Sequence, residues 1–342
     1  MLSHSIRVKR LPAALGIAFL SGLGLMTARP VLAQTQYSFT SFDVSGTGLT
    51  DTAIFGLNDS GEIAGSYMDA GGNTNAFYGT TASQNDVDLS KVLASQTPAF
   101  SEINKINNAG TYAGDFEMSS TSGYTTQQGF VGTNGTVIAT SIPNSQALGI
   151  NNLNTTVGEV QNSTGTGDQS YVQSSTGTVT KFNVLNFDTS EATAINDSGV
   201  IVGNAALTTT NGPTVSYIRS AGSNPTFSFI DIGGAYDVFA QDISNDGTVV
   251  GAYDTLAGDE YGFVFTGASL TTVTFPDALA TEVEAINSQG ELAGTYIDSM
   301  GVQHGFLAAP VPEASTTVSL GLLLGMGGLM LIAKRKKAQA AA

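Results

Sequence analysis

The chain has 342 residues, a length that allows one large domain or two of ordinary size. Its 28 acidic and 12 basic residues give a net charge of −16, and a surface this acidic repels phosphate backbones, which argues against a nucleic-acid partner. Cysteine is absent, which excludes disulfides, a thiolate nucleophile and cysteine-bound metals.

Residues 1–33 are predicted to be a secretory signal peptide. A basic stretch at 7–10 and an apolar run at 11–26 precede a cleavage site between Ala33 and Gln34. The alternative is a retained membrane anchor. It is disfavoured because the run is shorter than the ~20 residues that a membrane span needs.

Six copies of a ten-residue motif recur through the body without gaps. They occupy residues 56–65, 105–114, 149–158, 194–203, 242–251 and 285–294. Their closing glycines are spaced by 49, 44, 45, 48 and 43 residues. A period near 45 indicates a four-stranded propeller blade.

Each copy is predicted to form a tight hairpin. An Asn or Ser begins the turn by bonding to nearby backbone, and a Gly three positions later supplies a positive φ. In the third copy Asn154 replaces that Gly, so backbone angle rather than catalysis explains the position. The closing Gly is expected to end the second strand, where a side chain would not fit. The turn positions are Asn58, Gly61, Gly65, Asn107, Gly110, Gly114, Asn151, Asn154, Gly158, Asn196, Gly199, Gly203, Gly247, Gly251, Asn287, Gly290 and Gly294.

Two more strands follow each hairpin in most units. Third strands are expected at 75–78, 128–131, 170–172, 216–218, 261–265 and 304–307. Fourth strands are expected at 136–140, 178–182, 226–230 and 270–275, with 87–93 as a poorer copy. The sixth unit lacks a fourth strand, and residues 37–44 can supply it. We therefore predict an all-β, six-bladed β-propeller over residues 34–309, closed by pairing of the N-terminal strand with the last blade. A β-solenoid is the alternative.

The motif Ile-Asn-x-x-Gly-x-x-x-Gly, followed by Gly-Phe, resembles the HAF type of extracellular repeat over nearly the whole body. The resemblance implies an extracellular repeat protein. It carries over neither an activity nor functional residues.

His304 is the only histidine of the predicted mature chain, and Ser-His-Asp catalysis would require it. Other units hold Asn75, Gln128 and Tyr261 in the same position, which favours a structural role. No catalytic residue is therefore assigned. A glycosidase needs only two suitably placed acids, and with 28 acids present the sequence selects no pair.

Acidic loops begin at Asp69, Asp254 and Asp298, and their oxygens are of the kind that Ca²⁺ prefers. They lack the spacing of an EF-hand or of a calcium-binding repeat, so we expect solvated turns and assign neither metal nor cofactor. Aromatic residues two positions after the closing Gly, such as Tyr67 and Phe116, are expected to pack between blades rather than stack on sugars.

Residues 310–342 are predicted to be a sorting signal. An apolar run at 317–333 is long enough for a short transmembrane helix, and the basic tail at 334–337 should stay on the cytoplasmic side. The run is preceded by Val311, Pro312, Glu313, Ala314 and Ser315. This order resembles the PEP-CTERM signal of Gram-negative bacteria, although Ala314 stands where that family more often has Pro. The resemblance implies that an exosortase-type transpeptidase recognises Pro312 and Glu313 and removes the helix. A plain C-terminal anchor is the alternative.

Together these features predict a secreted, non-catalytic protein of the cell surface or biofilm matrix, structural or binding in role. It would pass transiently through the inner membrane, and the sorting resemblance names extracellular polysaccharide as a candidate partner. The alternatives are a lectin-like exopolysaccharide binder and a secreted glycan-processing enzyme.

Overall fold

The computed structural model describes residues 36–311, apart from 94–97, 99, 120–124, 162–166, 208–211 and 268. Residues 39–309 belong to one compact unit, and the fold described below is the fold of that unit. The predicted signal peptide, the Ala33–Gln34 cleavage site, residues 312–315, the helix at 317–333 and the tail at 334–337 lie outside the described residues. Within the described ranges, no helix is long and apolar enough to cross a membrane.

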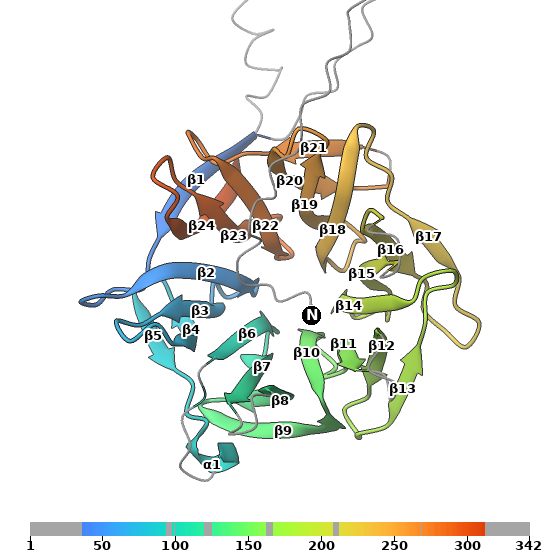
Figure 1. Ribbon diagram of the computed structural model, residues 1–342, viewed down its shortest axis with the longest axis horizontal. Coiled ribbons are helices and arrows are strands. Elements are labelled where there is room, and N and C mark those ends of the chain that lie inside the picture. The colour runs from blue at the N-terminus through green and yellow to red at the C-terminus, as the bar shows by residue number, and fades with distance from the viewer. Residues whose placement is uncertain are drawn as a thin grey trace, which may run out of the picture. The chain divides into compact units, whose positions relative to one another are not determined.

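The strands form six groups arranged around a central axis (Figure 1). The first group holds β2 (Thr50–Leu57), β3 (Ile63–Met68), β4 (Thr74–Thr80) and β5 (Ser83–Asp86). The second holds β6 (Phe100–Ile106), β7 (Thr111–Ser119), β8 (Thr125–Thr133) and β9 (Thr136–Pro143). The third holds β10 (Ser145–Ile150), β11 (Thr156–Gln161), β12 (Asp168–Gln173) and β13 (Val179–Phe182). The fourth holds β14 (Thr189–Ile195), β15 (Ile201–Ala206), β16 (Val215–Arg219) and β17 (Phe227–Phe229). The fifth holds β18 (Ala235–Ile243), β19 (Val249–Thr255), β20 (Glu260–Phe265) and β21 (Leu270–Val273). The sixth holds β22 (Ala280–Ile286), β23 (Leu292–Ile297) and β24 (Gln303–Val311).

The sixth group is completed by the first strand of the chain. β1 (Gln36–Phe42) pairs with β24, so it forms the outermost strand of the last blade. The hydroxyls of Ser41 and Tyr296 lie 2.9 Å apart across this blade. Phe42, Ile54 and Ala293 share one buried cluster, which joins the sixth blade to the first. Each sheet stays open while the blades close into a ring, and the six-bladed β-propeller is confirmed.

One predicted strand is wrong. Residues 87–93 do not form the fourth strand of the first blade; that strand is β5, and a short helix, α1 (Ser90–Leu93), follows it. Leu89 and Leu93 are both buried in the same cluster, and the N–H of Leu93 donates to the backbone oxygen of Leu89 at 3.0 Å, which is a helical hydrogen bond. β5 itself reads Ser-Gln-Asn-Asp, which contains no residue with a high β-propensity.

The closing glycine does not end its strand, as the sequence predicted, but stands inside it. Gly203, for example, is the third residue of β15 and lies opposite Tyr217 of β16. A Cβ at Gly203 would stand 2.0 Å from the Glu191 carbonyl oxygen and 2.6 Å from the Tyr217 hydroxyl. In all six copies that carbonyl distance is between 1.9 and 2.1 Å. The aromatic residues opposite the six glycines are fully buried: Phe77, Phe130, Tyr171, Tyr217, Phe263 and Phe306.

Candidate functional site

The six repeat turns lie around one end of the central channel, and the first Asn of each turn organises it. Asn151 Oδ1 accepts hydrogen bonds from the N–H groups of Leu153, at 3.0 Å, and Thr155, at 2.9 Å. The fourth residue of the turn then has a positive φ, 57° at Asn154 and 75° at Gly61. The same pair of bonds forms in the copies that begin with Asn58, Asn107, Asn196 and Asn287.

The amide nitrogen of the same Asn holds the next blade. Asn151 Nδ2 donates to the backbone oxygen of Asn196 at 3.1 Å, and Asn196 Nδ2 donates to that of Ser244 at 3.2 Å. Asn58 and Asn107 make the equivalent bonds at 3.0 Å each. Ser244 has no amide, and its hydroxyl donates within its own turn. Each of these Asn side chains therefore stabilises its own turn and also hydrogen-bonds to the turn of the next blade.

The residue after each turn Asn makes a second set of links, which sequence reasoning missed. The N–H of Asn152 donates to Asp197 Oδ1 at 2.9 Å, and the N–H of Asp197 donates to Asn245 Oδ1 at the same distance. Equivalent bonds join three further blade pairs. The available signal was a short polar residue at this position in every copy: Asp59, Asn108, Asn152, Asp197, Asn245 and Ser288.

These side chains form the rim of a concave mouth of about 570 Å³, a volume that includes its open side. One aliphatic residue per blade lines it inside the rim: Leu57, Ile106, Ile150, Ile195, Ile243 and Ile286. Asp59 and Asp197 come from the first and fourth blades, which are opposite positions in a ring of six. Burial by itself would raise the pKa of Asp197, but hydrogen bonds from Asn152 and Asn245 outweigh it, and that pKa is lowered. An apolar floor inside a rim that carries amides and the carboxylates of Asp59 and Asp197 suits a polar ligand that is not anionic and has an apolar face.

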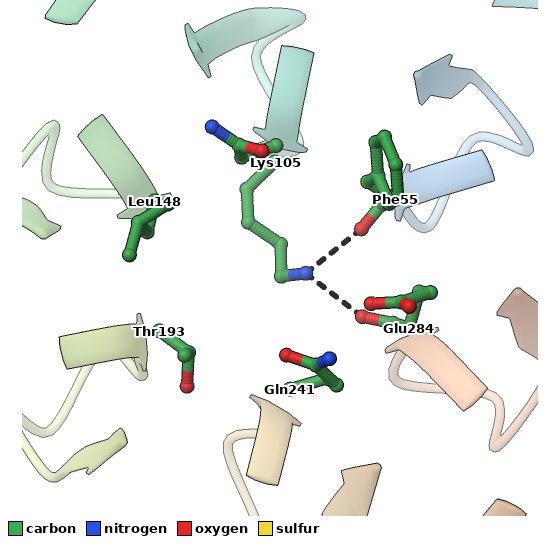
Figure 2. Close-up of a pocket in the computed structure, with 7 residues that line it drawn as sticks. Phe55, Lys105, Leu148, Thr193, Gln241 and Glu284 are labelled. Atoms are coloured by element: carbon green, nitrogen blue, oxygen red, sulfur yellow. Dashed lines mark hydrogen bonds between the residues drawn. The ribbon is translucent and has the colours of Figure 1, made fainter. Parts of the chain in front are cut away.

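Below the mouth, a β-bulge in each innermost strand directs a side chain toward the axis. In β14, for example, Ala192 and Ala194 pair with consecutive residues of β15, which leaves Thr193 unpaired. The six bulged residues line a small cavity on the axis, about 210 Å³ when the open space around it is included, as Figure 2 shows for the five that it labels. They are Phe55, Asn104, Leu148, Thr193, Gln241 and Glu284.

Lys105 crosses this cavity and occupies the channel (Figure 2). Its Nζ donates to the backbone oxygens of Phe55 and Glu284, both at 2.8 Å. Lys105 belongs to the second blade, so these bonds join it to the first and the sixth blades. In the fifth blade Asp242 occupies the position of Lys105, and burial raises the pKa of Asp242 against the opposing effect of the Lys105 charge. The channel is thus closed by a cation that bridges three blades.

Two buried carboxyl groups have strongly perturbed pKa values. Glu102 is 1% exposed and lies opposite Asp115, and neither of its carboxyl oxygens has a hydrogen-bond partner among the described residues. Burial, followed by the charges of Asp115 and Glu284, raises the pKa of Glu102 well above its usual range. Burial and the charge of Glu191 do the same for Glu159, which is 9% exposed. Both groups are buried inside the protein.

His304 lies at the closure of the ring, far along the chain from its partner. Its Nδ1 lies 3.0 Å from Asp43 and its Nε2 lies 3.4 Å from Asp298 Oδ2, while its ring stacks on Tyr296 with centroids 5.1 Å apart. With a carboxylate at each ring nitrogen, the side chain joins the segment after β1 to the sixth blade.

Two of the three acidic loops form turns through their first residue, and the third forms its turn through Thr255, whose Oγ1 accepts the N–H of Asp259 at 3.2 Å. Asp69 Oδ1 accepts the N–H groups of Gly71 and Asn73, and these bonds, that of Asn73 first, lower the pKa of Asp69. Asp298 Oδ1 does the same for Met300 and Val302. Among the residues that the structure describes, no cluster of three His, Cys, Asp or Glu side chains suits a metal ion.

The structure therefore brings some of the residues predicted from the sequence together at the mouth and places the others elsewhere. Four of the turn Asn residues, Asn107, Asn151, Asn196 and Asn287, line the mouth, whereas the closing glycines pack inside the blades. Val311 is the last residue of β24, and the rest of the predicted sorting motif, Pro312 to Ser315, lies beyond the described ranges. The structure adds to the site two kinds of residue that the sequence did not predict: Lys105, and the polar residue that follows the first residue of each turn.

Comparisons with known proteins return solved structures only: no protein-family model matches the sequence, and no curated protein does. TolB from Acinetobacter baumannii is 11% identical, with a TM-score of 0.47, over 73% of this chain and 64% of that one. The present chain thus spans less than two thirds of that protein. A putative TolB from Agrobacterium tumefaciens is 12% identical, with a TM-score of 0.49, over 82% of this chain and 100% of that one. A triple mutant of AofleA from Arthrobotrys oligospora is 8% identical, with a TM-score of 0.45, over 82% and 88%. At these values the likenesses assign neither a family nor an activity.

Proposed function

We propose that this protein is a non-catalytic propeller that is exported, sorted to the cell surface or extracellular matrix, and acts there as a structural or binding module. The observation that carries the proposal is the mouth of the channel. Its amide groups tie neighbouring blades together, for example through Asn151 and Asn152. Groups held in this way keep the mouth rigid, and a rigid concave surface favours ligand binding.

Lys105 supports the same proposal, because it closes the channel below the mouth. A glycan-processing enzyme would instead need two carboxyl groups within reach of the sugar. Glu102 and Glu159 have the raised pKa of a catalytic acid, but burial between blades keeps both from a substrate. A lectin-like role at the mouth therefore ranks above hydrolysis, and a neutral segment of extracellular polysaccharide is the ligand that the amide rim favours.

The sorting step rests on the resemblance of residues 310–342 to the PEP-CTERM signal. β24 ends at Val311, and Pro312 and Glu313 follow at once, so removal of the helix would leave the propeller whole. An exosortase-type transpeptidase and transient residence in the inner membrane are parts of this proposal. The test is mass spectrometry of protein recovered from producing cells, in the wild type and in a Pro312→Ala, Glu313→Ala variant. We expect residues 317–342 to be missing from the wild type and present in the variant. A wild type that keeps the basic tail at 334–337 would show a plain anchor.

The binding role is tested by applying the full-length chain, in detergent micelles, to an array of bacterial exopolysaccharides with and without Ca²⁺. A binding module is retained, and Asn152→Ala, which alters the rim, weakens retention. Release of new reducing ends from any of these glycans would overturn the non-catalytic proposal. A purely structural protein would instead show a matrix defect on deletion and no retention.

A further inference from the structure

The mouth of the channel carries negative charge on two opposite sides of its rim. Asp59 of the first blade and Asp197 of the fourth both line it. At its base lie Lys105 and Asp242, whose opposite charges offset each other. None of the six four-residue turns around the mouth contains a Lys, Arg or His. Neither rim carboxylate forms an ion pair with any residue that the structure describes.

Each rim carboxylate is held by neutral donors, which fix its position and leave its charge in place. Asp59 Oδ1 accepts a backbone N–H of the sixth blade at 2.8 Å, and its Oδ2 accepts the amide of Asn108 at 2.7 Å. Asp197 Oδ2 accepts the amides of Asn152 and Asn245 at 2.9 and 2.8 Å. Although burial opposes them, these bonds lower the pKa of Asp197, so this carboxyl is ionised at neutral pH.

The floor between the two carboxylates is aliphatic, since one Leu and five Ile line the mouth inside the rim. A ligand that fits all of these features has a positive charge on each side and an apolar part between the charges. An ammonium group supplies such a charge, and its hydrogen bonds to a carboxylate are stronger than those between neutral groups. A neutral ligand contacts the same floor but leaves both carboxylates without a counter-ion. An inorganic cation pairs with the carboxylates but gains nothing from the floor.

We propose that the mouth binds a ligand with two ammonium groups separated by an apolar chain or ring face, one ammonium at Asp59 and the other at Asp197. The proposal rests on the binding role proposed for the mouth and names a ligand class for it. The amides of the rim accommodate neutral ligands, and the carboxylates add a preference for cationic ones. Two sources share this chemistry: a free polyamine, and a segment of polysaccharide whose amino sugars are not acetylated.

The test is isothermal titration calorimetry of the full-length chain in non-ionic micelles, with titration into empty micelles as the blank. One arm uses diaminoalkanes, from putrescine to longer chains, each beside the monoamine of the same length. The other arm uses a glucosamine tetramer beside its neutral, N-acetylated form. Ca²⁺ alone is the probe for a purely ionic site. The arm that gives the tighter binding identifies the source of the amines.

The variants are Asp59→Asn, Asp197→Asn and, as the matched control, Asp246→Asn. Asn already occupies the rim position in the second, third and fifth blades, so each rim substitution removes the charge and keeps a side chain that the fold accepts. Asp246 is exposed on the fifth turn and lies outside the lining of the mouth. Asp246→Asn thus removes the same charge from the same end of the ring. Urea unfolding of each variant verifies that the fold is intact.

We expect a dicationic probe, a diamine or the glucosamine tetramer, to bind at least tenfold more tightly than its monoamine or acetylated counterpart. That advantage should disappear in Asp59→Asn and in Asp197→Asn, persist in Asp246→Asn, and shrink as salt screens the charges. Equal losses in all three variants, or an affinity for Ca²⁺ that matches that of the dication, would overturn the proposal.

The outcomes also separate this proposal from the binding role on which it rests. Binding of the acetylated tetramer with no gain from free amines would overturn the dicationic ligand and leave the binding role of the mouth in place. Binding of no probe at millimolar concentration would overturn the dicationic ligand as well. The binding role itself fails only if the exopolysaccharide array is also negative.

Discussion

At the scale of single residues, the repeated motif has a separate physical reason at each position. The turn Gly is needed for its backbone angle, since nothing lies within 4 Å of a Cβ built at Gly61 or Gly247. The closing Gly is needed for space, because a carbonyl oxygen and an aromatic ring occupy the place of its side chain. The turn Gly and the closing Gly, four residues apart, therefore recur in the repeats for different physical reasons.

Gly203→Ala should lower the free energy of unfolding by about 3 kcal/mol or more, since its Cβ meets backbone on one side and Tyr217 on the other. Gly233→Ala is the control, because its Cβ would meet nothing within 4 Å and its φ is not positive. Urea denaturation followed by circular dichroism measures both. Equal midpoints for the two variants would contradict the steric explanation.

Asn151→Ser separates the two duties of the turn Asn. Serine keeps an oxygen for the turn, as Ser244 does, but removes the amide that donates to Asn196. The loss of one buried inter-blade hydrogen bond should reduce the free energy of unfolding by about 1–2 kcal/mol. The matched variant Ser244→Asn restores an amide and should not destabilise. A neutral Asn151→Ser, measured in the same urea titration, would show that the inter-blade bond contributes nothing.

At the scale of elements, the interfaces between blades are partly polar, and a carboxyl is buried in one of them. Glu102 on β6 faces Asp115 on β7, and Asp115 accepts hydrogen bonds from Asn104 and from Gln146 of the next blade. The pKa of Glu102 is raised in the folded state by its burial and by the charges of Asp115, Glu284 and Glu117. The folded protein therefore holds a proton that the unfolded chain has already released.

Because of that raised pKa, Glu102 should make the protein less stable as pH rises. Below the ordinary glutamate pKa both states bind the proton, and above it only the folded state does, so the free energy of unfolding falls until the folded pKa is passed. Glu102→Gln removes this dependence and should be more stable than the wild type at pH 7–8, with a difference that shrinks toward pH 4. Urea midpoints measured across pH 4–8 check it. Parallel pH profiles for the two proteins would contradict it.

At the scale of the whole molecule, contacts at three distances from the central axis hold the ring together. At the axis Lys105 joins the first, second and sixth blades, at the mouth the turn side chains join neighbours, and at the outer edge β1 completes the last blade. Since β1 comes from the opposite end of the chain, its pairing with β24 joins strands more than 250 residues apart. His304 and Asp43 strengthen that junction.

Removal of residues 34–44 should therefore leave β24 as an open sheet edge and produce aggregation and a lower urea midpoint. A synthetic peptide of residues 36–44, added in excess, should restore the midpoint by supplying the missing strand. Size-exclusion chromatography and urea titration measure both effects. A truncated chain that stays monomeric with an unchanged midpoint would show that closure by β1 is dispensable.

The sequence by itself determined the number of blades, the turn conformation and the source of the closing strand. These properties are periodic or local: six copies of one motif, Asn154 in place of a turn Gly, and an unpaired strand pattern at 37–44. Two predictions from the sequence were wrong, the strand at 87–93 and the closing Gly as the end of a strand. In both places tertiary packing, rather than the local sequence, sets the conformation. Only the tertiary structure revealed the position of Lys105 in the channel, the links between turns and the buried Glu102. Each of these depends on residues 13 to 229 positions apart along the chain, which the curvature of the ring brings together. No local sequence pattern indicates that curvature.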